Sequence, residues 1–491
     1  MKPNLVFYNP KSNDGKRILP MSLLAVGAVI DDQYDFSIVD GNCEGDPVAA
    51  IRARVQQGAN VLAVTVMPGP QLTRAVLHCR ALKQEFPNLT IVWGGYFPTQ
   101  HADACLKEPY VDFVVRGHGE MIFKHLLDAL AAQADYASLA GLAYRDAGGK
   151  IVQNPLAPMP HPDQLPPWPY HRIDMRQYLR NTFLGSRTMP HHSSYGCPFF
   201  CNFCGVVNMA KGRWLPQSAE RIAEIAQLYA KEWGVNAIEF YDSNFFTSEA
   251  RVAEFAERVM PLSLGWWGEG RIDTMLKYSD RTWEQMRAGG LKMVFMGAES
   301  GSAETLKQMD KGGTLTPEMT LAMAAKIKEY GIIPEFSMVM GNPPDAEADI
   351  RDSIEFIRKI KQVNPSSEIV MYTYTPVPLD GGLYEEALAT GFRFPETLDE
   401  WVSDEWLEFS QRHSAHLPWL TSHQMQRVRN FERVLNAYYP TTTDGRLTGR
   451  WREILRAVSA WRYNLRVYES PLELRALQKV VHYQRPETSG F

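Results

Sequence analysis

"SSYGCPFFCNFCGVVN", residues 193–208, places three cysteines within eight positions. They are Cys197, Cys201 and Cys204, spaced C-x3-C-x2-C. Thiolates grouped this closely bind zinc or an iron–sulfur cluster. A closed structural metal site has four protein ligands, and this stretch supplies three. The fourth position is therefore either completed from elsewhere in the chain or left open.

Two metal centres fit the cysteine run. His191 or His192 would complete a Cys3His zinc site, but such sites usually close small modules with paired cysteine knuckles. This run instead follows a predicted strand of a large α/β domain. A cluster held by three thiolates leaves one iron open to the substrate of an electron transfer. The sequence therefore favours an iron–sulfur cluster.

Strand and helix patterns alternate on both sides of the cysteines, over residues 186–395. The expected strands are 191–196, 237–244, 264–271, 292–300, 334–341 and 368–376, with helices such as 219–233 and 317–330 between them. Six such units predict a partial (β/α)6 barrel of the TIM type. The chemistry of these barrels lies at the carboxyl ends of the strands.

The chain before the barrel has a second α/β pattern. Apolar runs at 4–9, 36–40, 61–66, 89–95 and 111–117 alternate with helical segments. They predict a doubly wound, Rossmann-like parallel sheet over residues 1–135. Seven prolines between 155 and 171 indicate a linker over 136–185. Residues 396–491 are expected to be mainly helical and to shape the substrate site, with Ile454, Leu455, Val458, Trp461 and Leu465 forming an apolar helical stripe.

Composition excludes several classes of function. The 491 residues require two or three domains, and 51 basic against 56 acidic side chains provide no basic field for nucleic acid. The longest apolar stretch, 21–30, is about half of a bilayer span, and the N-terminus has the pattern of a strand. We expect a cytoplasmic protein without nucleic-acid or membrane partners. Cys43, Cys79 and Cys105 are expected to be reduced thiols.

The cysteine run, with Phe203 before its last cysteine, resembles the signature of the radical S-adenosylmethionine (SAM) superfamily. In that family SAM chelates the open iron of a 4Fe–4S cluster and is cleaved to methionine and a 5′-deoxyadenosyl radical. The strand ends FYDSNFF, GEGRID, MGAESGS, VMGNPP and YTPVPLDGGLYEEA resemble the family in the same order. The resemblance implies that the three cysteines ligate the cluster. It also implies SAM contacts at Phe203, Asp242, Asn244, Glu269, Arg271, Glu299, Ser300 and Gly341.

The segments VWGGYFPTQ (92–100) and VDFVVRGHGE (111–120) resemble the cobalamin-binding domain that precedes many radical SAM enzymes. Glycines after a strand let the backbone approach a bulky ligand. The resemblance implies cobalamin contacts at Asn9, Thr65, Met67, Gly69, Gln71, Gly94, Gly95, Thr99, Gly117, Gly119 and Glu120. The Asp-x-His-x-x-Gly motif is absent, so we expect no axial histidine and the loop 67–71 beneath cobalt. His118 replaces a glutamate of the family pattern and is expected in a surface loop.

The resemblance implies an enzyme that uses a 4Fe–4S cluster, SAM and cobalamin on a small-molecule substrate, with an external electron donor such as flavodoxin or ferredoxin. The expected reaction is methylation of an unactivated carbon. One alternative is a cobalamin-dependent oxidative cyclase or hydroxylase of the tetrapyrrole type. Another is a non-catalytic cobalamin carrier or sensor, against which the cysteine triad argues because a carrier needs no cluster.

Overall fold

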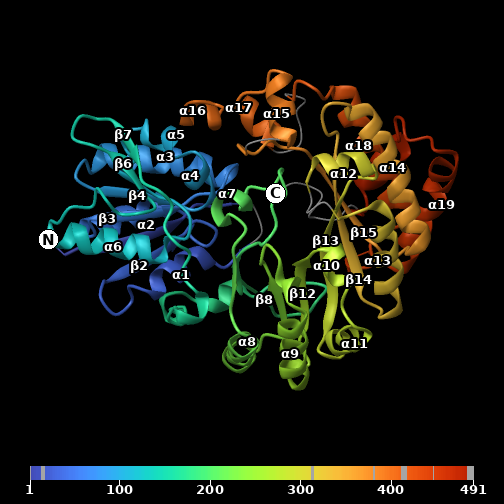
Figure 1. Cartoon of the computed structure of the whole chain (residues 1–491), viewed down its shortest axis with the longest axis horizontal. Coiled ribbons are helices and arrows are strands. Elements are labelled where there is room, and N and C mark those ends of the chain that lie inside the picture. The colour runs from blue at the N-terminus through green and yellow to red at the C-terminus, as the bar shows by residue number, and fades with distance from the viewer. Residues whose placement is uncertain are drawn as a thin grey trace.

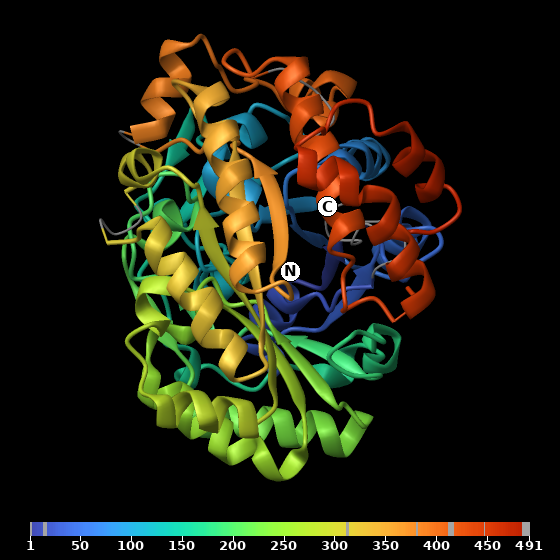
Figure 2. The same cartoon turned by 90° about the vertical axis from the view of Figure 1, so that its right-hand side faces the viewer.

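The computed structural model describes residues 2–12, 17–310, 314–379, 382–410, 417–445 and 447–483. Figure 1 shows an N-terminal α/β domain beside a larger α/β domain, with the C-terminal helices covering the far side of the second and bridging across to the first. Figure 2, turned by 90°, shows the strands of the second domain curving inside a layer of helices.

The N-terminal domain is built on a sheet with the order β2-β1-β3-β4-β5-β6-β7. Its strands are β1 (Leu5–Asn9), β2 (Phe36–Asp40), β3 (Val61–Thr65), β4 (Thr90–Gly94), β5 (Phe113–Val115), β6 (Leu142–Arg145) and β7 (Ile151–Gln153). Its helices are α1 (Met21–Ala28), α2 (Pro47–Gln56), α3 (Pro70–Glu85), α4 (Tyr96–Gln100), α5 (Ala102–Leu106) and α6 (Gly119–Ala132). All five residues of β1 are buried, as expected of a parallel strand covered on both faces.

The predicted parallel sheet is confirmed for β1–β5, and two further strands extend it. β6 pairs antiparallel with β5, and β7 pairs antiparallel with β6. These strands lie within the segment predicted as a linker, so the N-terminal sheet ends at residue 153 rather than near residue 135. Short hairpin strands give a weak sequence signal, because their pairing rather than their own composition stabilises them. The 3₁₀ turns Pro162–Gln164, Tyr170–Arg172 and Met175–Tyr178 follow.

The second domain is the predicted partial barrel. Six parallel strands have the order β15-β14-β13-β12-β11-β8. They are β8 (Thr188–His191), β11 (Ala237–Phe240), β12 (Gly265–Gly270), β13 (Leu291–Glu299), β14 (Ile333–Met340) and β15 (Glu368–Thr373). The main outer helices are α8 (Ala219–Trp233), α9 (Glu249–Val259), α11 (Asp280–Ala288), α13 (Pro317–Glu329) and α14 (Ala346–Val363). Shorter elements are α7 (Val206–Ala210), α10 (Ile272–Met275), α12 (Ala303–Gln308) and the 3₁₀ turns Phe245–Thr247 and Met260–Leu262.

The first barrel strand differs from the prediction. The expected strand 191–196 is divided between β8, which ends at His191, and β9 (Ser194–Gly196), which pairs antiparallel with β10 (Trp214–Pro216). The chain leaves the barrel between them because the Ser193 backbone N–H donates to Asp242 at the end of β11. The sequence pattern alone cannot show this tertiary contact.

The C-terminal region is helical, as predicted. Its helices are α15 (Gly382–Ala389), α16 (Leu398–Trp401), α17 (Asp404–Ser410), α18 (Ser422–Tyr438), α19 (Gly449–Leu465) and α20 (Leu472–Gln478). Only part of the predicted apolar stripe on α19 faces the core. Leu455 is buried and Val458 packs against the core, whereas Ile454 is 43%, Trp461 49% and Leu465 70% exposed. The buried side of α19 also carries Ser459, Arg462 and Tyr463, and the Arg462 guanidinium pairs with Glu473 of α20.

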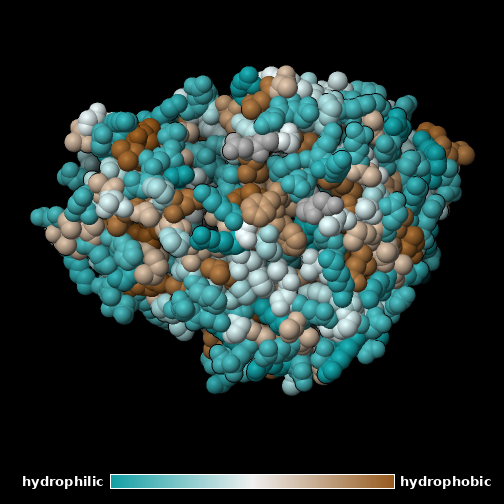
Figure 3. Space-filling model, viewed as in Figure 1, coloured by the Kyte–Doolittle hydropathy of each residue, from teal (hydrophilic) through white to brown (hydrophobic). Residues whose placement is uncertain are grey.

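The surface in Figure 3 is mainly hydrophilic, with apolar side chains in scattered groups. Within the described ranges, none of the helices combines the length and apolar character needed to cross a bilayer. Cys79 and Cys105 are buried in the core of the N-terminal domain, and Cys43 is half-buried. All three are free thiols, as the sequence predicts.

Candidate functional site

The three cysteines of the opening motif lie in one loop between β9 and α7, beyond the carboxyl end of β8. All three are half-buried. Gly196 begins the loop with φ +75°, where a Cβ would lie 2.3 Å from the Arg213 carbonyl oxygen, so only glycine fits. The loop is held by the Asn202 N–H, which donates to the Met309 carbonyl at 3.1 Å. The sequence therefore presents the cysteines on a defined loop at the catalytic end of the barrel.

The environment of the cysteines suits a bound cation. Burial raises the pKa of the Cys204 thiol to about 12, and the neighbouring Cys201 and Cys197 add to the shift. A metal centre supplies the positive charge that such thiolates need, and it deprotonates them on binding. The donor set of three thiols therefore fits the iron–sulfur cluster that the motif predicts.

The structure argues against the zinc alternative. His191 is buried at the end of β8, where its Nε2 lies 2.9 Å from Gln217 Oε1, and its ring packs against Trp168 on the outer face of the barrel. His192 lies beside the Tyr195 ring, with the two ring centroids 5.8 Å apart.

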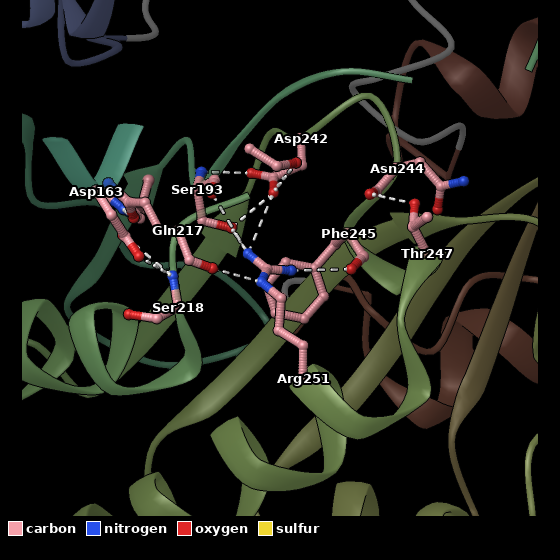
Figure 4. A network of polar contacts seen from close by, with 11 residues as sticks. Asp163, Ser193, Gln217, Ser218, Asp242, Asn244, Phe245, Thr247 and Arg251 are labelled. Atoms are coloured by element: carbon pink, nitrogen blue, oxygen red, sulfur yellow. Dashed lines mark hydrogen bonds and ion pairs between the residues drawn. The ribbon is translucent and has the colours of Figure 1, made fainter. Parts of the chain in front are cut away.

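Asp242, a predicted SAM contact, anchors the segment that leads into the cysteine loop (Figure 4). Its fully buried carboxylate accepts hydrogen bonds from the Ser193 N–H and Oγ at 2.6 Å and from Ser194 Oγ at 2.7 Å. Arg251 of α9 donates to the Ser193 carbonyl and hydroxyl and lies 4.0 Å from the carboxylate. These contacts make Asp242 the support of the loop that carries the cysteines.

Asn244 and Glu269 are positioned to meet a polar ligand. Both side-chain amide atoms of Asn244, which is 1% exposed, have no hydrogen-bond partner within the described ranges. A buried polar group without a partner is costly, so these atoms are suited to a ligand such as SAM. On β12, burial together with the nearby carboxylates Asp242 and Glu335 raises the pKa of Glu269 to about 8.

A buried carboxylate joins the ends of β13 and β14. Asp349 of α14 accepts from Ser300 Oγ at 2.8 Å, from the Gly341 N–H at 2.8 Å and from the Asn342 N–H at 3.1 Å. The neighbouring Glu299 has φ +63°, which is uncommon for a residue with a side chain and often marks a functional site. Its carboxylate accepts from Ser337 Oγ at 3.1 Å. Three predicted SAM residues are thus brought together at adjacent strand ends.

The predicted cobalamin residues gather at the carboxyl edge of the N-terminal sheet. Thr99 Oγ1 donates to the Gly95 carbonyl at 2.7 Å and accepts from the Gly117 N–H at 3.0 Å, which ties the turns after β4 and β5 together. Gly95 has φ +101°, and a Cβ there would approach the Val66 backbone to 3.1 Å. Gly69 also has a positive φ, with open space beside it. A backbone cradle without side chains suits a large, flat cofactor.

Other residues that were predicted to contact cobalamin form hydrogen bonds within the N-terminal domain. The Gln71 side-chain amide donates to Asn9 Oδ1 and to the Pro10 carbonyl, each at 3.0 Å, and its oxygen accepts from the Met67 N–H. Asn9 and Gln71 are buried and shape the loop, whereas the Met67 side chain is 49% exposed. Thr65 Oγ1 lies 3.1 Å from Ser22 Oγ on α1. Met67 is therefore the residue of this loop that is best placed to meet a ligand.

Glu120 connects the two domains. One oxygen of its buried carboxylate accepts a hydrogen bond, 2.5 Å long, from the hydroxyl of Tyr195, which lies two residues before Cys197. The other carboxylate oxygen of Glu120 has no partner among the described residues. The His118 ring packs on Tyr195 with centroids 4.3 Å apart. Burial lowers the pKa of His118 to about 4, with His192 adding to the shift. His118 thus lies half-buried in the loop after β5, where it packs against the other domain.

Three residues of the site were missed by sequence reasoning, namely Asp273, Asp349 and Tyr195. Asp273 is the last residue of the strand-end motif GEGRID, and Tyr195 lies two residues before Cys197, so both stand within the stretches that the sequence singles out. Asp349 lies on a helix 49 residues beyond its partner Ser300, and nothing in the local pattern indicates their contact.

Comparison with known proteins agrees with this geometry. The Radical SAM superfamily model matches residues 192–357, and the B12 binding domain model matches residues 13–127. An uncharacterized methyltransferase of Pyrococcus horikoshii is 27% identical over 366 residues, 72% of this chain and 78% of the relative. The anaerobic magnesium-protoporphyrin IX monomethyl ester cyclase of Synechocystis is 26% identical over 365 residues, 73% of this chain and 71% of the relative.

The fold is also found in a solved structure. The cobalamin-dependent SAM radical enzyme OxsB, with aqua-cobalamin and SAM bound, superimposes with a TM-score of 0.70 over 97% of this chain and 75% of its own, at 15% identity. The two domains and their order define a radical SAM enzyme with a B12 binding domain. The chain thus combines a Radical SAM domain with a B12 binding domain that precedes it, and its cofactors are a 4Fe–4S cluster, SAM and cobalamin.

Proposed function

We propose that the chain is a cobalamin-dependent radical SAM methyltransferase acting on an unactivated carbon of a small molecule. Cys197, Cys201 and Cys204 would ligate the cluster. Asn244, Glu269, Glu299, Ser300 and Gly341 line the barrel edge where SAM would bind, with Phe203 in the cysteine loop beside it. When bound, the cluster supplies the electron that cleaves SAM, and cobalamin carries the methyl group.

The observation that carries the proposal is the contact between the cobalamin-side loops and the cysteine loop. Besides the Glu120–Tyr195 bond, Gln100 Nε2 donates to the Gly205 carbonyl at 3.1 Å and its oxygen accepts from Asn208 at 2.7 Å. Tyr96 lies so close to Gly205 that a Cβ there would be 1.9 Å from the phenol oxygen. The strand ends suited to cobalamin therefore adjoin the loop suited to the cluster. This arrangement suits methyl transfer between the two sites.

Product analysis tests the proposal. The reconstituted, reduced enzyme with SAM, cobalamin and candidate substrates should form 5′-deoxyadenosine and S-adenosylhomocysteine in equal amounts. A second SAM must remethylate cobalamin in each turnover, which accounts for the second product. With methyl-deuterated SAM the product should carry the label. Flavodoxin or ferredoxin is the proposed electron donor, and each should support turnover in place of a chemical reductant.

The cyclase relative supports a second candidate, oxidative ring closure or hydroxylation. Such an enzyme would form 5′-deoxyadenosine without stoichiometric S-adenosylhomocysteine. That outcome would refute the methyltransferase and leave the radical SAM assignment intact. A chain that takes up one zinc and no iron would refute both.

A further inference from the structure

Arg271 lies between the barrel and the cysteine loop, and its contacts point to the cluster rather than to SAM alone. Its Nη1 donates to Cys201 Sγ at 3.4 Å. The guanidinium carbon lies 3.7 Å from the centroid of the Phe199 ring, which belongs to the same loop. The side chain is 6% exposed.

The guanidinium is held in this place from behind. Asp273 accepts from Nε at 3.0 Å and from Nη2 at 2.7 Å, a two-point pairing that fixes the plane of the guanidinium. Thr314 Oγ1 donates to the same carboxylate at 2.7 Å. This pairing places the Asp273 carboxylate against the buried guanidinium and balances its charge. The arginine is therefore a fixed cation beside Cys201.

We propose that Arg271 tunes the reduction potential of the cluster by donating a charge-assisted hydrogen bond to the thiolate of Cys201. The inference rests on the proposed ligation of the cluster by the three cysteines. Reduction adds one negative charge to the cluster, and a donor at a ligating sulfur stabilises the reduced form more than the oxidised form. Arg271 thus raises the potential and makes the electron easier to deliver. It acts as a positioning and tuning residue, separate from any contact with SAM.

The test is potentiometric EPR of the reconstituted full-length chain in the absence of SAM, so that a lost SAM contact cannot move the result. Arg271→Met removes the donor and the charge, and its midpoint potential should fall. A tenfold loss in the equilibrium constant for reduction corresponds to about 59 mV for one electron. Arg271→Lys keeps the charge without the planar fork and should fall less. Asp273→Asn removes the opposing anion and should shift the potential upward.

The matched control is Arg358→Met. Arg358 is a similarly buried arginine on α14. It donates to the Tyr463 carbonyl and to the Tyr468 hydroxyl, both in the C-terminal region. Its potential should equal that of the wild type. An Arg271→Met variant with full iron content and the wild-type potential would overturn the inference. If that variant fails to load a cluster, the Arg271→Lys potential decides in the same way. A wild-type chain that loads no cluster would refute the proposed function itself.

Discussion

The pKa of Glu269 reflects its surroundings inside the barrel. It faces inward from β12, where burial, Asp242 and Glu335 raise its pKa to about 8. Because side chains alternate along the strand, Trp266, three residues earlier, points the opposite way into the apolar core. Near neutral pH this carboxyl holds a proton and can therefore donate a hydrogen bond to a polar group of a ligand.

Replacing Glu269 by Gln should change the pH dependence of stability. The raised pKa means that the native state keeps a proton which the unfolded state loses above its ordinary carboxyl pKa. Stability therefore falls as pH rises through the window up to about 8. The Gln side chain of Glu269→Gln has no proton to lose. The free energy of unfolding of this variant should therefore rise, relative to that of the wild type, by on the order of 2 kcal/mol between about pH 6 and pH 9. Denaturant unfolding at both pH values measures this, and parallel pH profiles for the two proteins would contradict it.

At the scale of elements, Asp349 connects one helix to two strands. Its carboxylate takes hydrogen bonds from Ser300 after β13 and from Gly341 and Asn342 after β14. Two predicted SAM residues thus depend on a helical residue for their geometry. The backbone N–H groups of Gly341 and Asn342 have their acceptor in this one carboxylate.

Asp349→Asn should destabilise the fold and weaken SAM binding together. The amide offers one acceptor oxygen and turns its NH₂ toward N–H donors, which leaves buried groups unpaired at a cost of about 2–4 kcal/mol. Equilibrium unfolding and SAM titration on the cluster-loaded enzyme measure the two effects. Asp352→Asn is the control, because that side chain pairs with exposed Arg351 on the same helix. Equal behaviour of the two variants would show that Asp349 has no special role.

The sequence predicted elements well where local pattern decides structure. The expected helix 219–233 is α8 residue for residue, and the expected strand 36–40 is β2. Runs of buried apolar residues between glycines and prolines carry that signal. The failures have tertiary causes. The expected strand 191–196 is divided where the Ser193 N–H donates a hydrogen bond to Asp242. Helix α19 buries Arg462, whose guanidinium forms an ion pair with Glu473.

The candidate site divides in the same way. The motifs identified the loops, and the structure places the predicted residues at the carboxyl ends of strands, in the loops beside them or in the helices that follow. The sequence could not predict the partner of each side chain. Glu120 accepts a hydrogen bond from Tyr195 across a domain boundary, and Arg271 donates to Cys201 from a different strand end. The roles of these residues toward SAM and cobalamin stay predictions.

At the scale of the whole molecule, the α16 region (Leu398–Trp401) packs against the N-terminal domain and forms a clasp. The α16 region packs Trp401 against Phe97, with centroids 5.0 Å apart, and against His101 at 4.5 Å. Asp399 pairs with Arg80 at 2.6 Å. Leu398 and Trp401 are part of the same apolar core as β3 and β4. The N-terminal domain thus contacts the α16 region as well as the cysteine loop, in addition to its covalent connection to the barrel.

We expect the contacts of the α16 region to hold the two domains together even without their covalent connection. A single protease cut in the exposed, proline-rich stretch near Gln164 should yield two fragments that still migrate as one particle. The same two pieces, expressed as separate genes, should assemble into a heterodimer. Trp401→Ala combined with Asp399→Ala should let the nicked halves separate on gel filtration, whereas the uncut double variant should stay intact. Separation of the nicked wild type would show that the linker, and not the clasp, keeps the two halves together.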